Sequence, residues 1–183
     1  GGGSWPRAGG RLEARASGFG SPSRAGGPRS RGQGRPGSMI KFILMVNKQG
    51  QTRLAQYYDF LTVRERVTLE GELIRKCLSR NESQCSFVEY RQYRVVYRRY
   101  ASLYFIVGTD NDEDANELAL LEFIHVLVET LDKYFENVCE LDIMFNLEKA
   151  HIILDEMVLD GCIVDTNKAA VLNPLYLLEK HSA

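Results

Sequence analysis

The stretch with the strongest structural signal runs from residue 95 to residue 105 and reads Val95 Val96 Tyr97 Arg98 Arg99 Tyr100 Ala101 Ser102 Leu103 Tyr104 Phe105. Valine, tyrosine and phenylalanine are enriched in strands because their side chains pack well on a pleated surface. We therefore interpret the run as two aromatic-rich β-strands that meet at a tight corner.

Further strand signals lie on both sides of this run. Three segments rich in Tyr, Phe and Val follow one another with very short turns: 85–90, 93–99 and 101–108. This pattern predicts a meander. Nearer the N-terminus, the apolar run 40–46 ends at Asn47 Lys48 Gln49 Gly50, and an extended pattern resumes over 51–58. Turn residues between two extended runs predict a hairpin.

An amphipathic helix is expected between the hairpin and the meander, from Thr62 to about Ser79. Its apolar positions recur every three or four residues: Val67, Leu69, Leu73, Ile74 and Leu78. This spacing places them on one helical face. Thr62 and Glu65 have the spacing of a capping box, which would fix the start of the helix.

A long helix is expected over 116–135, with one apolar stripe formed by Leu120, Ile124, Leu127, Leu131 and Tyr134. Leu121, Phe123, Val126 and Val128 lie outside that stripe. The helix therefore needs cover on more than one face, from its own sheet and from either a neighbouring helix or a partner protein.

The C-terminal part predicts further helices. One helical region runs over 140–159 and is expected to end at Asp160 Gly161, with the glycine as its C-terminal cap. A short last helix follows Asp165 Thr166, and Pro174 should interrupt or end it. The order of elements predicts an α+β domain, a five-stranded antiparallel sheet with helices packed on its faces. This order resembles the longin-like fold.

Composition divides the chain at Met39. Residues 1–38 hold 12 of the 16 glycines, four of the five prolines and seven arginines against one acidic residue. So few aliphatic side chains cannot offset the chain entropy lost on folding. We expect 1–38 to be a disordered tail or a non-native leader, with a phosphate-binding basic arm as the alternative. Residues 39–183, with 16 basic and 23 acidic residues, should form one domain.

Several classes of protein do not fit the chain. No segment reaches the roughly 18 to 20 apolar residues that span a bilayer, so we expect a soluble protein. Four cysteines without CxxC spacing argue against a zinc site or a disulfide framework. Three histidines outside any nucleophile, zinc or phosphate motif make an enzyme improbable, and we expect no cofactor.

A calcium loop is suggested by Asp110, Asp112 and Asp114 but fails at two required positions. Ala115 stands where the loop needs glycine, and Leu121 stands where it needs a bidentate glutamate. We therefore expect no metal site, and we interpret the acidic stretch as a turn at a helix N-terminus.

Nucleic-acid binding is a more serious rival, because tyrosines and arginines interleave over 90–100 as they do in single-strand binders. Strand alternation, however, puts Tyr97 and Arg99 on one face and Arg98 and Tyr100 on the other. The net negative charge of 39–183 is also the wrong sign for a phosphate binder. We expect no nucleic-acid partner.

Beyond its structural signal, the opening run resembles the signature of the small (sigma) subunits of adaptor protein complexes: two aliphatics, Tyr, a basic residue, any four, then Leu, Tyr, Phe. Further stretches that look like this family are Met39 Ile40 Lys41 Phe42 Ile43 Leu44, Gly50 Gln51 Thr52 Arg53 Leu54, Cys139 Glu140 Leu141 Asp142 Ile143 Met144 Phe145 Asn146, and Ile153 Leu154 Asp155 Glu156 Met157. Within the family, 46–54, 84–89 and 161–164 look most like the branch found in adaptor protein complex 4.

The resemblance implies a non-catalytic subunit of a heterotetramer with two large adaptin subunits and one medium subunit. Such a complex would associate peripherally with the cytosolic face of trans-Golgi network and coated-vesicle membranes and sort cargo towards endosomes. A free-standing longin-like domain of a SNARE or a tethering complex is the alternative.

The resemblance also implies a cargo site for acidic dileucine signals, in which an acidic residue precedes a leucine pair. Carried over by position, the apolar cleft would be lined by Ala101, Leu103, Val128, Val138 and Ile143, with Asn137 at its rim. Arg53 would lie near the acidic cargo residue. The alternative for each apolar residue is plain core packing.

Overall fold

The computed structural model describes residues 39–80, 84–111 and 116–182. The prediction for 1–38 and the proposed acidic turn at Asp112 and Asp114 lie outside the described residues.

Within the described residues, one antiparallel sheet holds five strands: β1 (Ile40–Asn47), β2 (Thr52–Tyr57), β3 (Phe87–Tyr90), β4 (Tyr93–Tyr100) and β5 (Leu103–Asp110). The strand order is β2-β1-β5-β4-β3, so the N-terminal hairpin joins the meander through the β1–β5 ladder. The predicted α+β class with a five-stranded antiparallel sheet is confirmed. Ala101, with φ 51°, forms the tight corner between β4 and β5, so β5 starts two residues later than expected.

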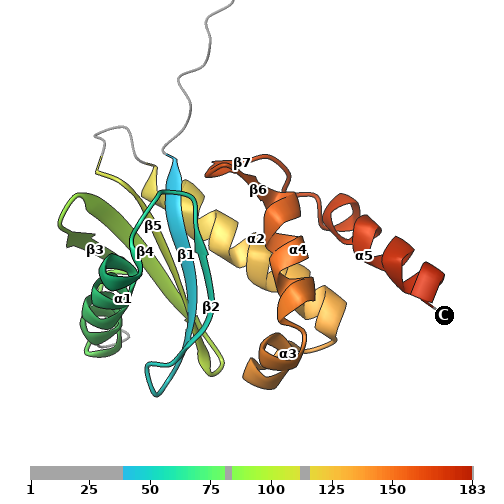
Figure 1. Cartoon of the computed structure of the whole chain (residues 1–183), viewed down its shortest axis with the longest axis horizontal. Helices are drawn as coiled ribbons and strands as arrows, with labels where there is room; N and C mark the ends of the chain where they lie inside the picture. The colour runs from blue at the N-terminus through green and yellow to red at the C-terminus, as the bar shows by residue number, and fades with distance from the viewer. Residues whose placement is uncertain (1–38, 81–83, 112–115, 183) are drawn as a thin grey trace, which may run out of the picture. The chain divides into compact units, whose positions relative to one another are not determined.

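The helices are α1 (Val63–Leu78), α2 (Glu117–Phe135), α3 (Glu140–Phe145), α4 (Leu147–Met157) and α5 (Lys168–Ser182). Figure 1 shows α1 on one face of the sheet and the other helices towards the opposite face. The inner strand β1 is buried on both sides, because Phe42 and Leu44 belong to the core under α1 while Ile43 and Met45 belong to the core with α2, α4 and α5.

Helix α1 begins where the sequence predicts. The Thr62 backbone N–H donates to Glu65 Oε2 at 2.8 Å, and the Glu65 N–H donates back to Thr62 Oγ1 at 3.4 Å, which completes the capping box. The buried stripe is formed by Leu69, Leu73 and Cys77. Val67 was wrongly assigned to it: its side chain is 66 % exposed.

Helix α2 is covered on its second face by the chain itself. Its buried residues share one core with Ile153 and Leu154 of α4 and with Leu172 of α5 (Figure 1). The prediction left open whether a helix or a partner protein gives this cover, and the structure shows helices.

The predicted helix over 140–159 is wrong in its continuity and its end. The chain leaves helical geometry at Asn146, with φ −124°, which separates α3 from α4. Strands β6 (Val158–Leu159) and β7 (Cys162–Ile163) then form a small hairpin. Gly161, with φ 78°, turns this hairpin rather than capping a helix, and a Cβ there would lie 2.4 Å from the Ile40 carbonyl oxygen.

Helix α5 is longer than the short helix expected and continues through Pro174. Proline removes one backbone N–H from the helical ladder. Val171, Leu172 and Leu175 are buried on both sides of it, so packing against the core holds the helix together across the missing hydrogen bond.

Candidate cargo-binding cleft

A cavity of about 280 Å³ lies beside the corner between β4 and β5. It is lined by Tyr100, Ala101, Ser102, Leu103, Phe105, Val128, Asp132, Val138 and Cys139. Four of the predicted cleft residues, Ala101, Leu103, Val128 and Val138, therefore meet around one cavity although they come from the corner, β5, α2 and the segment after α2.

The segment after α2 forms one wall of this cavity. Glu136 and Asn137 both have positive φ, 53° and 78°, so the chain turns sharply at the end of the helix. The Val138 N–H then donates to Asp132 Oδ1 at 3.0 Å, which fixes the segment against α2. Asp132 and Cys139 line the cavity without having been predicted, because their roles depend on this turn.

Two predicted site residues lie outside the cavity lining. Asn137 is exposed on the turn. Ile143 of α3 is 0 % exposed and belongs to the same core as Leu103 and Val128. A role of Ile143 in cargo binding stays a prediction.

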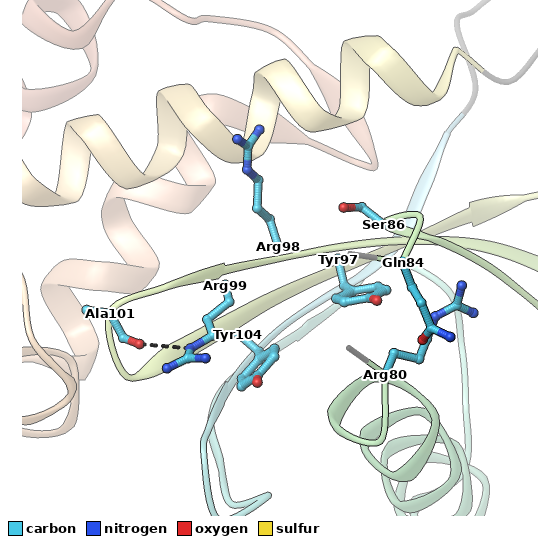
Figure 2. Close-up of a pocket in the computed structure, with 8 residues that line it drawn as sticks. All are labelled: Arg80, Gln84, Ser86, Tyr97, Arg98, Arg99, Ala101 and Tyr104. Atoms are coloured by element: carbon cyan, nitrogen blue, oxygen red, sulfur yellow. Dashed lines mark hydrogen bonds between the residues drawn. The ribbon is translucent and has the colours of Figure 1, made fainter. Parts of the chain in front are cut away.

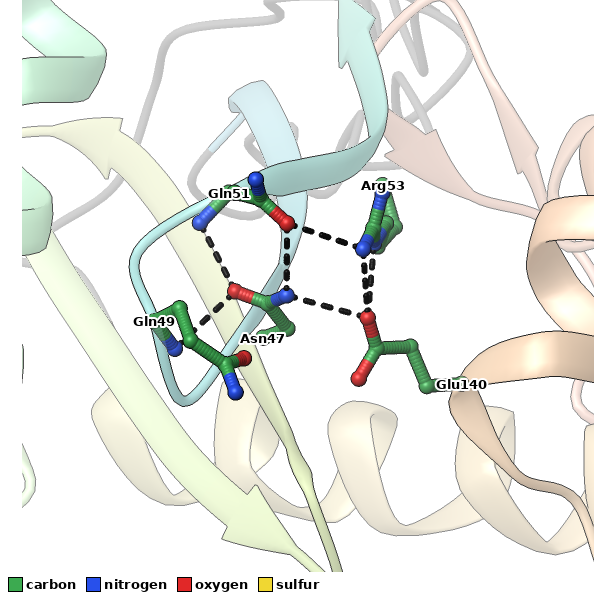
Figure 3. Close-up of polar contacts among 5 residues, drawn as sticks. All are labelled: Asn47, Gln49, Gln51, Arg53 and Glu140. Carbon is green, nitrogen blue, oxygen red and sulfur yellow. Dashed lines mark hydrogen bonds and ion pairs between the residues drawn. The ribbon is translucent and has the colours of Figure 1, made fainter.

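Arg53 of β2 belongs to a polar cluster with Asn47, Gln51 and Glu140 (Figure 3). Its Nε and Nη2 atoms lie 2.8 Å and 2.7 Å from Glu140 Oε1, and Nη2 also donates to Gln51 Oε1 at 2.9 Å. Asn47 pairs with Leu103 across the β1–β5 ladder, and Glu140 directly follows Cys139. The cluster therefore adjoins the cleft.

Asn47 is the anchor of this cluster. It is 1 % exposed, and its Oδ1 accepts hydrogen bonds from the backbone N–H groups of Gln49 and Gln51 at 3.0 Å and 2.8 Å. Its Nδ2 donates to Glu140 Oε1 at 2.9 Å. The hydrogen bonds from Asn47 and Arg53 lower the pKa of Glu140, because they favour its charged form.

A second cavity, of about 680 Å³, lies on the other side of Ala101, which lines both. Figure 2 shows Arg99, Tyr97 and Tyr104 on the side of the sheet that faces Arg80, while Arg98 points to the opposite side. The cations of β4 are thus divided between the two faces of the sheet, as strand alternation predicts. This division does not favour a nucleic-acid platform, and the absence of such a partner stays a prediction.

Among residues 39–80, 84–111 and 116–182, no group of three or more His, Cys, Asp or Glu side chains is placed to hold a metal ion. Within the same ranges, no helix has the length and apolar character that crossing a bilayer requires. All four cysteines lie in these ranges and are free thiols.

The family model of the clathrin adaptor complex small chain matches residues 39–182. The chain belongs to this family. This small chain is 70 % identical over 141 residues to the AP-4 complex subunit sigma of Arabidopsis thaliana, covering 77 % of this chain and 97 % of the relative. It is 59 % identical over 144 residues to the AP-4 complex subunit sigma-1 of Homo sapiens, covering 79 % and 99 %.

Structural comparison agrees with the sequence comparison. The small chain superposes with a TM-score of 0.64 and 29 % identity on a chain of a homology model of the full-length AP-3 complex in a stretched open conformation, covering 79 % of this chain and 95 % of that one. The predicted resemblance and the longin-like fold are confirmed. The protein is a sigma-type adaptor subunit, similar to those of AP-4, that acts in vesicle-mediated intracellular protein transport. Subunits of this family are structural adaptors and are not known enzymes.

Proposed function

We propose that this small chain assembles with two large chains and one medium chain, and that its cleft helps to recognise acidic dileucine signals in cargo tails. The complex would bind peripherally at the cytosolic face of the trans-Golgi network and of coated vesicles, and carry cargo towards endosomes. Membership in the adaptor small-chain family and the similarity to AP-4 sigma subunits support this proposal.

The observation that carries the cargo proposal is the shared cavity of Ala101, Leu103, Val128 and Val138. Three of these side chains are apolar and larger than a methyl group, and they converge from β5, α2 and the segment after it. An apolar cavity with a few polar groups at its edge is the usual form of a ligand site. Ser102 and Asp132 are polar lining residues, and the ion pair of Arg53 and Glu140 lies in the polar cluster that adjoins the cleft.

The size of the expected binding energy suits a reversible adaptor. Burying two leucine side chains contributes about 3 to 6 kcal/mol. Association costs offset much of this gain, so a single signal binds weakly. Several weak contacts made together at a membrane then give avidity without making each one permanent.

Partner chains have exposed apolar surface to cover. Leu159 in the β6–β7 hairpin is 66 % exposed, Val164 directly after the hairpin is 56 % exposed, and Phe145 of α3 is 75 % exposed. A third group lies before and along α1, where Phe60 is 91 % exposed. Apolar patches of this kind mark protein–protein contacts, and we assign them to the large and medium chains.

Exchange of Arg53 for glutamate tests the cargo proposal. In the complex reconstituted with the full chain, R53E should lower affinity for an acidic dileucine peptide more than about tenfold, since the new carboxylate faces both Glu140 and the acid of the peptide. Isothermal titration calorimetry measures the change. K180E is the matched control, because Lys180 is an exposed cation in the last turn of α5, outside the three apolar groups assigned to the partner chains.

A second pair of measurements separates lost binding from lost folding. V138S removes an apolar side chain from the lining of the cleft and leaves the polar cluster unchanged. It should also lower the affinity of the complex for the peptide. A peptide with Ser-Ser in place of Leu-Leu should bind neither variant nor the unaltered complex. Undiminished binding by both R53E and V138S would rule out this cleft as the cargo site.

A further inference from the structure

The guanidinium of Arg53 already holds a carboxylate of the same chain. Glu140 Oε1 accepts from Arg53 Nε at 2.8 Å and lies 2.7 Å from Nη2, with the two side chains 25 % and 22 % exposed. We infer that Glu140 is an internal competitor that occupies the place of the acidic cargo residue, an inference that rests on the proposed function. Glu140 thereby determines how strongly the affinity of the cleft depends on the acidic residue of the signal.

The contact uses the edge of Arg53 that recognises carboxylates best. Nε and one Nη atom form the fork in which arginine makes paired, charge-assisted hydrogen bonds. In Figure 3 this edge faces Glu140. A carboxylate from a peptide must therefore displace Glu140 from the fork or accept a less favourable edge beside a like charge.

The cluster is built so that Arg53 can leave while Glu140 stays. Asn47 is buried and fixed by two backbone N–H groups, and its Nδ2 donates to the same Glu140 oxygen at 2.9 Å. Glu140 keeps this hydrogen bond when Arg53 moves. The other partner of Arg53 is the neutral Gln51, to which Arg53 donates a single hydrogen bond.

The consequence is a cleft that gains little from an acidic residue in the signal. Before the peptide binds, the Arg53 charge is compensated by Glu140, so the attraction felt by a second carboxylate is small. Exchange of one ion pair for another yields less free energy than formation of a new one. Glu140 therefore keeps binding weak and makes the leucine pair the larger determinant of affinity.

Replacement of Glu140 by glutamine removes the charge and keeps the shape. The amide oxygen of the glutamine side chain still accepts from Asn47 and Arg53, so the cluster retains its hydrogen bonds. In the reconstituted complex, E140Q should bind an acidic dileucine peptide about fivefold more tightly than the unaltered complex, the scale of one partly exposed ion pair. A peptide with glutamine in place of its acidic residue should bind both equally.

E148Q is the matched control, because Glu148 is an exposed carboxylate in the first turn of α4. The four combinations of complex and peptide form a cycle that isolates the coupling between Glu140 and the cargo acid. If E140Q binds the acidic peptide no more tightly, or if it strengthens both peptides alike, the inference is wrong while the cargo proposal stands. If no complex binds either peptide, both are wrong.

A measurement on the unaltered full chain covers the case in which E140Q folds poorly. The side-chain carboxyl carbon of Glu140 gives an NMR signal that reports loss of its Arg53 contact. This signal should shift on addition of the acidic dileucine peptide and stay in place with the glutamine-substituted peptide. A signal that stays in place with both peptides, although both bind, would overturn the competitor role.

Discussion

At the scale of single residues, Gly108 of β5 lies where the sheet leaves no room for a side chain. It pairs with Phe42 across the β1–β5 ladder, and a Cβ on Gly108 would meet the Phe42 ring at 2.1 Å. Phe42 is 0 % exposed and packs edge-on to Tyr93 at 5.4 Å. We expect G108A to lower the free energy of unfolding by about 2 to 3 kcal/mol, measured by urea denaturation.

The matched control for G108A is G71A, because Gly71 lies on α1 with nothing within 4 Å of an added Cβ. There, alanine favours the helix by about 0.5 to 1 kcal/mol. The same chemical change should therefore act with opposite sign at the two positions. An unfolding free energy for G108A equal to that of the unaltered chain would show that the Phe42 ring can move aside.

The residues of the candidate site were predictable to different degrees. Ala101, Leu103, Val128 and Val138 could be named from family resemblance, and they share one cavity. The partner of Arg53 could not be named, because Glu140 lies 87 residues away and only the fold brings it to β2. The sequence could not show whether Ile143 lines the cleft or packs in the core, because both positions call for a buried apolar side chain.

At the scale of elements, the start of α1 depends on one local motif. T62A removes the hydroxyl that accepts from the Glu65 N–H and should cost about 1 kcal/mol of stability in urea denaturation. T68A is the control on the same helix: Thr68 is exposed, and its hydroxyl donates to the Arg64 carbonyl within the helix. Alanine is the better helix former there, so T68A should not destabilise. Equal losses in both would contradict the capping role.

Elements set by local rules were predicted better than elements set by packing. The capping box, the hairpin and the meander follow from neighbouring residues, and the structure contains all three. The break at Asn146, the β6–β7 hairpin and the course of α5 through Pro174 were missed. The β6–β7 hairpin and the course of α5 depend on contacts with distant residues, such as the hydrogen bond from the Ile40 N–H to the Gly161 carbonyl.

At the scale of the whole molecule, the apolar surface that remains for partners differs from the surface expected. The sequence left open whether a neighbouring helix or a partner protein covers the second face of α2, and in the structure α4 and α5 of the same chain share its core. Exposed apolar residues lie on the β6–β7 hairpin, on α3, and before and along α1, and others lie at Leu118 in the first turn of α2 and at Leu177 of α5. The hydrophobic periodicity of a helix shows which of its faces are apolar, but it does not show which of these faces other elements of the same chain will cover.

The rates at which the four cysteines react with a maleimide report which of these surfaces are covered. Cys77 is 1 % exposed, and burial raises the pKa of its thiol to about 12, so a maleimide should not label it in the folded chain. Cys85, Cys139 and Cys162 are exposed and should all react. Assembly with the large and medium chains should slow labelling of Cys162, which lies in the β6–β7 hairpin between exposed apolar residues.

Cargo should protect a different thiol from the one that assembly protects. Cys139 lines the cleft, so a saturating acidic dileucine peptide should slow its labelling in the assembled complex at least several-fold, while Cys85 keeps its rate. The Ser-Ser peptide should leave all rates unchanged. Mass spectrometry of labelled peptides measures each rate separately. Equal slowing of Cys85 and Cys139 would point to a change of the whole complex and not to a ligand in the cleft, and an unchanged Cys139 under saturating peptide would place the signal elsewhere.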